Sequence, residues 1–235
     1  MVDFHTHILP KMDDGSRSTD ESVAMLKLIC GQGIDRVVCT PHFYAEDESP
    51  VDFLNRRQAS FAALQRKLDV ESEVFPQIYL GAEVRYYEGF SHSLSLAGLK
   101  IEGTSLLLLE MPFTRWEPRM FKEIQNAQEN LECTVVLAHI ERYLQFRQES
   151  DFWDRLEQTG VLIQSNAEFF LSSILRRHRA FRLYKEGQIH LLGSDCHSIE
   201  RRPPNLGRAI ELIQAKLGLQ SLNRMEKLEQ QIFCQ

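Results

Sequence analysis

Residues 1–7 read Met-Val-Asp-Phe-His-Thr-His, and this segment organises the rest of the chain. The apolar start from Met1 to Phe4 predicts a short first strand, which His5 and His7 follow directly. Because side chains at i and i+2 of an extended segment point to the same face, His5 and His7 can offer two ring nitrogens to one metal ion. A lone His-x-His also occurs as two surface histidines at a strand end, so the rest of the chain must decide between these interpretations.

Short apolar runs alternate with amphipathic segments along the whole chain. We predict seven strands, at residues 1–4, 36–40, 77–84, 105–109, 134–138, 161–165 and 189–193. Helices are expected at residues 18–30, 51–68, 118–131, 151–158, 168–186, 203–217 and 222–232, the first of them opened by a capping box from Ser18 to Glu21. Several strands are apolar on both faces, as parallel strands buried between helices should be. The alternation therefore predicts an α/β fold of the (β/α) barrel type, with seven strands.

Composition limits the class of protein. The chain has 235 residues, of which 43% are hydrophobic and 26% charged, and it carries no linker-like break, so we expect a single domain over residues 1–235. A net charge of −6 argues against nucleic acid as a partner. No apolar run is long enough to insert into a membrane, and the start lacks an export signal. Five cysteines without framework spacing indicate free thiols in a cytoplasmic protein, whose oligomeric state the sequence leaves open.

Residues that can ligate metals follow the predicted strands. Besides the first pair, they are His42, Glu83, Glu110, His139, Asp195 and His197. Each one alone could be an ordinary loop histidine or a solvated carboxylate, although Glu110 follows four leucines and a buried charge must be paired or bound to metal. In a (β/α) barrel the carboxyl ends of all strands meet at one rim. Together these residues predict a site for more than one metal ion.

The residue types also indicate a reaction. Mixed histidine and carboxylate ligands suit Mn, Fe or Zn in an open, catalytic site. Neighbouring metal ions can lower the pKa of a shared water, which supplies a hydroxide for phosphoester hydrolysis at neutral pH. Arg142 follows His139 by three residues, and Arg202 follows His197 by five, so both could hold a phosphate group. Each arginine could equally form a surface ion pair.

Seven motifs contain most of these residues. They are His5-Thr6-His7, Asp13-Asp14-Gly15, Thr40-Pro41-His42, Gly81-Ala82-Glu83, His139-Ile140-Glu141-Arg142-Tyr143, Ser194-Asp195-Cys196-His197 and Arg202-Pro203-Pro204. In this order, from residue 1 to about 215, the chain resembles the PHP-superfamily protein tyrosine phosphatases of bacterial capsule and exopolysaccharide loci (CpsB/CapC-like). The His-Ile-Glu-Arg-Tyr and Arg-Pro-Pro elements are specific to that branch of the superfamily.

The resemblance implies a distorted seven-stranded barrel with up to three metal ions, most often Mn²⁺. One ion would take His5, His7, Glu83 and Asp195, a second would share Glu83 and add Glu110 and His139, and a third would take Asp14, His42 and His197. Arg142 and Arg202 would bind the phosphate, and Arg201, where relatives often have a small residue, is a further candidate for substrate binding. The implied substrate is phosphotyrosine on the tail of a cognate bacterial tyrosine autokinase that controls polysaccharide export.

Other functions are compatible with parts of the sequence. The cysteine-phosphatase pattern Cys-x5-Arg occurs at Cys30–Arg36 and at Cys196–Arg202, but Cys30 ends a helix instead of a strand and Cys196 lies between two candidate ligands. We therefore reject a thiol mechanism. A PHP-type phosphatase for a small metabolite such as histidinol phosphate, or a phosphodiesterase, would share the ligands, and a non-catalytic metal-binding regulator of a kinase is the alternative outside enzymes.

Overall fold

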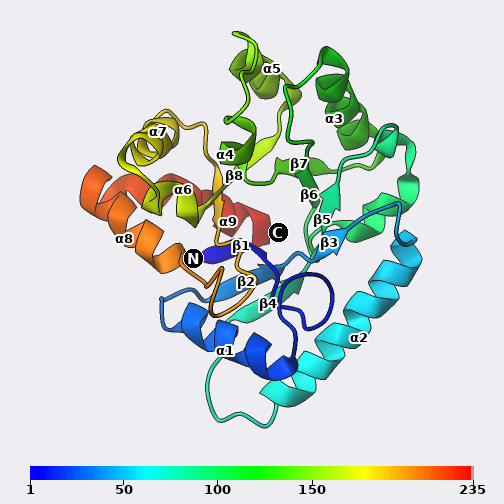
Figure 1. Cartoon of the computed structure of the whole chain (residues 1–235), viewed down its shortest axis with the longest axis vertical. Coiled ribbons are helices and arrows are strands. Elements are labelled where there is room, and N and C mark those ends of the chain that lie inside the picture. The colour runs from blue at the N-terminus through cyan, green and yellow to red at the C-terminus, as the bar shows by residue number, and fades with distance from the viewer. Residues whose placement is uncertain (234–235) are drawn as a thin grey trace.

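The computed structural model describes residues 1–233 and contains a curled sheet of parallel strands surrounded by helices (Figure 1). The strands are β1 (Val2–Thr6), β2 (Arg36–Cys39), β3 (His42–Phe43), β4 (Gln77–Leu80), β5 (Glu83–Arg85), β6 (Leu106–Glu110), β7 (Thr134–Leu137), β8 (Leu162–Asn166) and β9 (Leu191–Gly193). The helices are α1 (Thr19–Cys30), α2 (Pro50–Leu68), α3 (Pro118–Asn130), α4 (Ile140–Tyr143), α5 (Phe152–Thr159), α6 (Ala167–Leu171), α7 (Ile174–Lys185), α8 (Leu206–Leu217) and α9 (Asn223–Phe233). Short 3₁₀ helices cover Phe90–His92, Leu94–Leu99 and Leu219–Leu222.

The strands occupy seven positions around a distorted barrel. Strands β1, β2 and β4 pair in that order, and a second run pairs β3, β5, β6, β7, β8 and β9. Strand β3 follows β2 after two residues, and β5 follows β4 after two residues, so each pair occupies one position in the barrel. The two runs of strands therefore overlap at the second and third positions. A parallel bridge between Thr6 and Cys196 joins β1 to the segment after β9. The seven-stranded α/β barrel predicted from the sequence is therefore confirmed in its distorted form.

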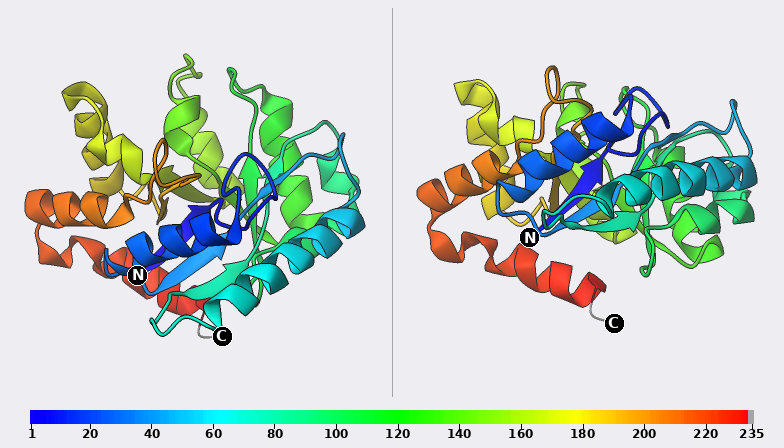
Figure 2. Two further views of the ribbon diagram at one scale, coloured as in Figure 1. Left: turned by 60° about the horizontal axis from the view of Figure 1, so that its bottom comes forward. Right: turned by 90° about the horizontal axis from the view of Figure 1, so that it is seen from below.

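Alternating side chains fill the interior of the barrel. Val2 and Phe4 of β1 pack with Val38, Leu108 and Val136, which come from three other strands. The intervening residues of these strands pack outward against the helices in a separate and larger core. Helix α9 covers the amino-terminal end of the barrel, on the far side from the dark blue loop that follows β1 (Figure 2). The candidate ligands thus lie at the opposite end of the barrel from α9, above its packed interior.

The structure corrects several predicted boundaries. The helix predicted at residues 168–186 is two helices, because the chain is extended at Ser172 and Ser173 between α6 and α7. The strand predicted at 77–84 is interrupted at Gly81 and Ala82. Helix α8 begins only after Pro203 and Pro204, at Leu206.

The predicted capping box at the first helix is half right. The Ser18 hydroxyl accepts a hydrogen bond from the Glu21 N–H at 3.1 Å, as expected of an N-cap residue. The Glu21 carboxylate, however, accepts from the N–H of Arg17 at 2.9 Å and not from that of Ser18. The helix is therefore capped by the serine, while the glutamate holds the preceding residue.

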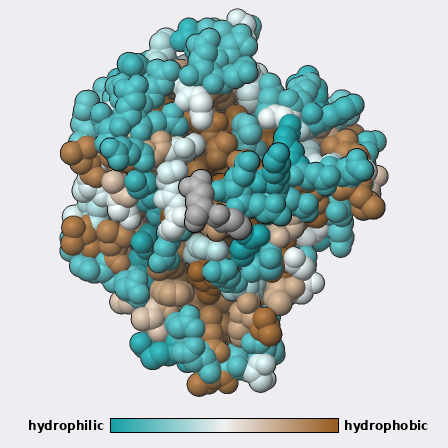
Figure 3. All heavy atoms as spheres, turned by 180° about the vertical axis from the view of Figure 1, so that it is seen from behind, coloured by the Kyte–Doolittle hydropathy of each residue, from teal (hydrophilic) through white to brown (hydrophobic). Residues whose placement is uncertain are grey.

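Hydrophilic side chains cover most of the rear face, with hydrophobic groups between them (Figure 3). Within residues 1–233, no helix is both long enough and apolar enough to cross a membrane. Cys30, Cys39, Cys133 and Cys196 carry free thiols, as predicted, and Cys234 lies outside the described residues.

Candidate metal centre

The two histidines of the first motif converge as predicted. Their Nε2 atoms are 3.1 Å apart, and both side chains are fully buried. The pairing of β1 with β2 shifts by one residue between Asp3 and Thr6, which is the signature of a β-bulge. Phe4 still packs in the barrel interior, whereas His5 and His7 beyond it turn into the mouth of the barrel. The irregular pairing thus falls at the segment of β1 that carries the first of the two imidazoles.

Glu83 lies in the centre of the cluster and is only 1% exposed. Its Oε2 is 3.1 Å from His5 Nε2, 3.4 Å from His7 Nε2 and 2.9 Å from His42 Nδ1. Its Oε1 is 2.8 Å from His139 Nε2. One carboxylate therefore faces four imidazoles, which come from three different strand ends.

Two further carboxylates complete the two sides of the cluster. Glu110 Oε1 lies 3.3 Å from His139 Nε2, on the same side as β6 and β7. Asp14 Oδ1 lies 3.6 Å from His42 Nε2 and 3.3 Å from His197 Nε2. Asp14 is 68% exposed and comes from the loop after β1, so it closes the cluster from the solvent side.

Asp195 connects the histidines with the arginines. Its Oδ1 is 3.6 Å from His5 Nε2 and 3.4 Å from His7 Nε2. Its Oδ2 is 2.5 Å from both Arg142 Nη2 and Arg202 Nη2. The carboxylate thus holds two guanidinium groups beside the imidazole cluster, which is where a phosphate group on bound metal would need positive charge.

The spacing of these atoms suits shared cations. Three groups of possible ligands have donor atoms within 4.8 Å of one another: His5 with His7 and Glu83; His42 with Glu83 and Glu110; and His7 with Asp14, His42 and His197. Donors about 2.1 Å from a common cation stand about 3 Å apart, close to the separations observed here. The buried atoms His42 Nδ1, Glu83 Oε2 and His197 Nε2 have no hydrogen-bond partner among the described residues. The residues present therefore fit divalent metal ions.

The electrostatics of the cluster also favour positive charge. Burial alone would raise the pKa of Glu83, but the charge on His5, the hydrogen bond from His139 and the nearby imidazole of His42 hold that pKa well below its usual value. Burial alone would lower the pKa of His139, but its hydrogen bonds to Glu110 and Glu83 raise that pKa to about 9. The carboxylates of Glu83 and Glu110 therefore favour a positive charge beside His139, which a proton or a metal ion can supply.

Two residues that the sequence did not single out orient the candidate ligands. Asp13 Oδ2 is 2.6 Å from His7 Nδ1 and accepts the His42 N–H at 2.9 Å. Gln164 Oε1 accepts the His139 N–H at 2.6 Å and lies 3.5 Å from His5 Nδ1. Partners of this kind fix the tautomer and orientation of ligating histidines. The Asp-Asp-Gly motif contained a signal for Asp13, but its spacing does not tell which aspartate faces a histidine ring.

The backbone is strained at two of the strand ends. His139 has a φ of 34° and Asp195 a φ of 52°, both in the left-handed region that residues with a Cβ rarely adopt. Strain of this kind persists where the surrounding structure imposes it and is common at functional sites. Gly193, just before the second of these turns, lies so close to β1 that an added Cβ would stand 2.6 Å from His5 Cβ.

Neighbouring arginines of the last motif have different environments. Arg202 pairs with Asp195, as described, whereas the exposed Arg201 forms no ion pair with any described residue. Of the two, Arg202 therefore lies against the metal-ligand cluster.

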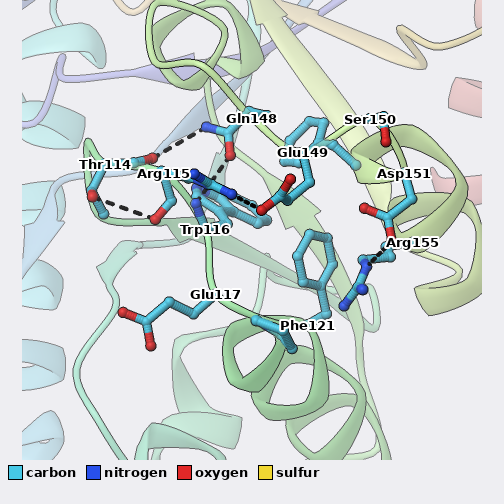
Figure 4. Close-up of a pocket in the computed structure, with 12 residues that line it drawn as sticks. Thr114, Arg115, Trp116, Glu117, Phe121, Gln148, Glu149, Ser150, Asp151 and Arg155 are labelled. Atoms are coloured by element: carbon cyan, nitrogen blue, oxygen red, sulfur yellow. Dashed lines mark hydrogen bonds and ion pairs between the residues drawn. The ribbon is translucent and has the colours of Figure 1, made fainter.

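A cavity of about 710 Å³ lies between the segment after β6 and the start of α5, and none of the candidate ligands lines it (Figure 4). Trp116, Phe121 and Phe152 contribute its apolar wall. Its charged groups largely satisfy one another: Arg115 pairs with Glu149, and Arg155 pairs with Asp151 at 2.6 Å. The cavity therefore offers a ligand little unpaired charge.

Neither cysteine pattern forms a thiol active site. Cys196 is fully buried, and burial raises the pKa of its thiol well above the usual value. Cys30 is exposed at the end of α1, where its Sγ contacts the carbonyl of Val74 at 3.5 Å. A phosphatase cysteine needs a stabilised thiolate, which the surroundings of Cys196 disfavour.

Comparisons with known proteins agree with this geometry. A family model for capsular polysaccharide synthesis, CpsB/CapC, matches residues 1–231. Tyrosine-protein phosphatase CpsB of Streptococcus agalactiae serotype III (strain NEM316) is 27% identical over 238 residues, which cover 96% of this chain and 94% of that protein. Tyrosine-protein phosphatase YwqE of Bacillus subtilis (strain 168) is 28% identical over 233 residues, covering 93% and 85%.

The fold is also found among solved structures. A chain from the crystal structures of YwqE from Bacillus subtilis and CpsB from Streptococcus pneumoniae, described as unique metal-dependent tyrosine phosphatases, superposes with a TM-score of 0.82. The match covers 100% of this chain and 94% of that one, at 22% sequence identity. The two chains therefore share their fold over the whole length.

Proposed function

Since the chain belongs to the capsular polysaccharide synthesis family CpsB/CapC, we propose that it is a metal-dependent tyrosine phosphatase. The relatives that match over nearly the whole chain are tyrosine-protein phosphatases. Residues from the motifs also come together in groups that could hold a metal ion. The observation that carries the proposal is the convergence of histidine and carboxylate side chains from separate strand ends, in groups whose donor atoms all lie within 4.8 Å of one another.

The proposed ligands form three sets. His5, His7, Glu83 and Asp195 would hold a first ion; Glu83, Glu110 and His139 a second; and Asp14, His42 and His197 a third. The distances among these donors and the unpartnered buried atoms support the assignment. The donor atom of His7 also lies within 4.8 Å of those of the third set. We propose Mn²⁺ as the usual ion, with Fe or Zn as alternatives that suit the same donors.

Divalent ions in such a site activate water at neutral pH and offset the negative charge of a phosphate group. The chain itself contributes the orientation of the substrate. Asp195 holds Arg142 and Arg202 with their guanidinium groups side by side, and both can bind non-bridging oxygens of the phosphate. Water then adds to phosphorus and loses a proton to solvent as the bond to the tyrosine oxygen breaks, and the tyrosinate leaves with the bonding electrons and takes up a proton from solvent. The two arginines stabilise the charge on the equatorial oxygens.

The biological setting follows from the family. We propose that the substrate is phosphotyrosine on the tail of a cognate bacterial tyrosine kinase that controls capsule or exopolysaccharide synthesis, and that the protein works in the cytoplasm. Free thiols at the four described cysteines support a reducing compartment.

Turnover of p-nitrophenyl phosphate and of a phosphotyrosine peptide, with Mn²⁺ and with chelator, tests the proposal. We expect activity that chelator abolishes, that His139→Ala loses and that Cys196→Ser retains. Histidinol phosphate serves as the comparison substrate and should be turned over far less efficiently than the peptide. Activity that resists chelator and is lost in Cys196→Ser would contradict the metal mechanism.

A further inference from the structure

A second cavity, of about 400 Å³, opens beside Asp195, between α4, α6, α7 and the segment from β9 to α8. Four arginines line it: Arg142, Arg176, Arg201 and Arg202. Arg142 and Arg202 are each bound to Asp195. Arg176 and Arg201 are exposed, and neither pairs with a carboxylate among residues 1–233. The cavity therefore holds two guanidinium groups beyond those that Asp195 positions.

The remaining carboxylates of the cavity do not neutralise this charge. Glu141 is buried and accepts hydrogen bonds from Ser165 Oγ at 3.2 Å and from the Asn166 N–H at 3.3 Å. Glu168 lines the cavity but is exposed and forms no ion pair with an arginine of the described residues. An anion that enters the cavity would therefore find Arg176 and Arg201 available.

The helix that carries Arg176 extends this positive surface. Helix α7 contains five basic residues and no acidic one, in a chain whose net charge is −6. Figure 1 shows α6, α7 and α8 together on one side of the barrel. Such a concentration of one sign of charge steers and holds a partner of the opposite sign. Helix α7 begins at the cavity, which Asp195 also lines. This charge therefore favours an anionic substrate whose phosphate group binds beside Asp195.

The same helix begins with two exposed aliphatic side chains. Ile174 is 81% exposed and Leu175 is 84% exposed, directly before Arg176. Exposed aliphatic groups beside unpaired arginines suit a polypeptide, which can supply both apolar and acidic side chains, better than a small phosphate ester.

On the basis of the proposed function, we infer that Arg176 and Arg201 form a subsite for a second anionic group on the polypeptide that carries the phosphotyrosine. The group is a carboxylate side chain or a second phosphate close to the scissile one. Arg142 and Arg202 hold the phosphate that is removed, while Arg176 and Arg201 select substrates whose neighbouring residue is negatively charged. The enzyme would therefore prefer acidic or multiply phosphorylated segments over isolated phosphotyrosine.

Steady-state kinetics on three phosphotyrosine peptides test the inference. The peptides are identical except for the residue beside the phosphotyrosine, which is glutamine, glutamate or a second phosphotyrosine. For each protein the readout is the ratio of kcat/KM for an anionic peptide to that for the glutamine peptide. Arg176→Ala and Arg201→Ala are compared with Arg182→Ala, which removes the same charge from an exposed position of α7 that does not line the cavity.

We expect a wild-type ratio of about tenfold, which Arg182→Ala keeps and which falls to about one- to threefold in Arg176→Ala and Arg201→Ala. The ratio should also shrink with added salt, because both arginines are exposed. A larger ratio for the second phosphotyrosine than for glutamate would assign the subsite to phosphate, and the reverse to carboxylate.

Two results would overturn the subsite. If all peptides are hydrolysed with equal efficiency, or if Arg182→Ala lowers the ratio as much as Arg176→Ala does, the inference fails while the proposed function stands. If no peptide is hydrolysed in the presence of Mn²⁺, the proposed function fails, and the subsite fails with it.

Discussion

Asp13 offers the sharpest single perturbation of the metal centre, because it touches two candidate ligands without being one. Its Oδ2 is 2.6 Å from His7 Nδ1 and accepts the His42 N–H, while its Oδ1 accepts the Gly15 N–H at 2.9 Å. Asp13→Asn keeps the shape of the side chain but leaves one carbonyl oxygen for these three donors. Either the Gly15 N–H or both the His7 ring and the His42 N–H must then face an amide NH₂ group, and in both orientations the His7 ring loses the charged acceptor that holds it.

The expected size of the effect follows from this contact. Removing the carboxylate behind a ligating histidine typically weakens metal binding about 10- to 100-fold, which corresponds to about 1.4–2.7 kcal/mol. Calorimetric titration of the metal-free protein with Mn²⁺ measures the affinity directly. The Mn²⁺ concentration that gives half-maximal hydrolysis of p-nitrophenyl phosphate should rise by the same factor, and saturating Mn²⁺ should restore most of kcat.

Asp20→Asn is the matched control, since Asp20 is 78% exposed and lies on α1 away from the ligand cluster. It removes the same charge and should leave the Mn²⁺ affinity within about twofold of the wild type. An Asp13→Asn protein with the affinity of the Asp20→Asn control would refute the reasoning that His7 depends on Asp13 for its orientation.

Three further predictions concern the fold beneath the centre. Burial raises the pKa of Glu229 from 4.5 to about 7, so the folded state loses stability as the pH rises through that range. Glu229→Gln should therefore match the wild type near pH 4.5 and exceed it at pH 8 by up to about 3 kcal/mol in urea unfolding, and a difference that does not change with pH would contradict this. The backbone of His139 is in the left-handed region, which glycine adopts more readily than alanine. In thermal unfolding with chelator present, His139→Gly should therefore be more stable than His139→Ala by about 0.5–1 kcal/mol. The opposite order would show that the backbone at His139 is not strained. Gly193→Ala would bring a Cβ to 2.6 Å from His5 Cβ, so we expect about 1–3 kcal/mol of destabilisation together with a loss of bound metal, and an unchanged melting temperature would show that β1 can move aside.

The ends of the strands could be predicted well because strands that are buried on both faces appear in the sequence as continuous apolar runs. The four leucines before Glu110 and the apolar run before His139 mark strands buried on both faces, and the order of elements then fixes which ends meet. Asp14 entered only through resemblance to a family, since it lies in a loop whose path no periodicity predicts. Its distance of 3.3 Å from His197 depends on how that loop folds back across the barrel.

Other features depend on tertiary contacts that no local pattern encodes. The separate roles of Arg201 and Arg202 arise from the turn after β9, which directs one side chain to Asp195 and leaves the other exposed. The left-handed conformation of His139 could not be predicted either, because propensity favours glycine or asparagine there. The break between α6 and α7 was missed because it falls at Ser172 and Ser173, where no glycine or proline marks the end of a helix.

The central claim is that nine side chains, eight from six of the motifs and Glu110 from the end of β6, bind shared cations. A crystal grown with Mn²⁺ and measured for anomalous scattering tests it most directly. We predict up to three anomalous peaks, each about 2.0–2.3 Å from the proposed donors, with Glu83 shared by two of them. Anomalous peaks elsewhere in the crystal and none among His5, His7, Glu83 and Asp195 would contradict the account.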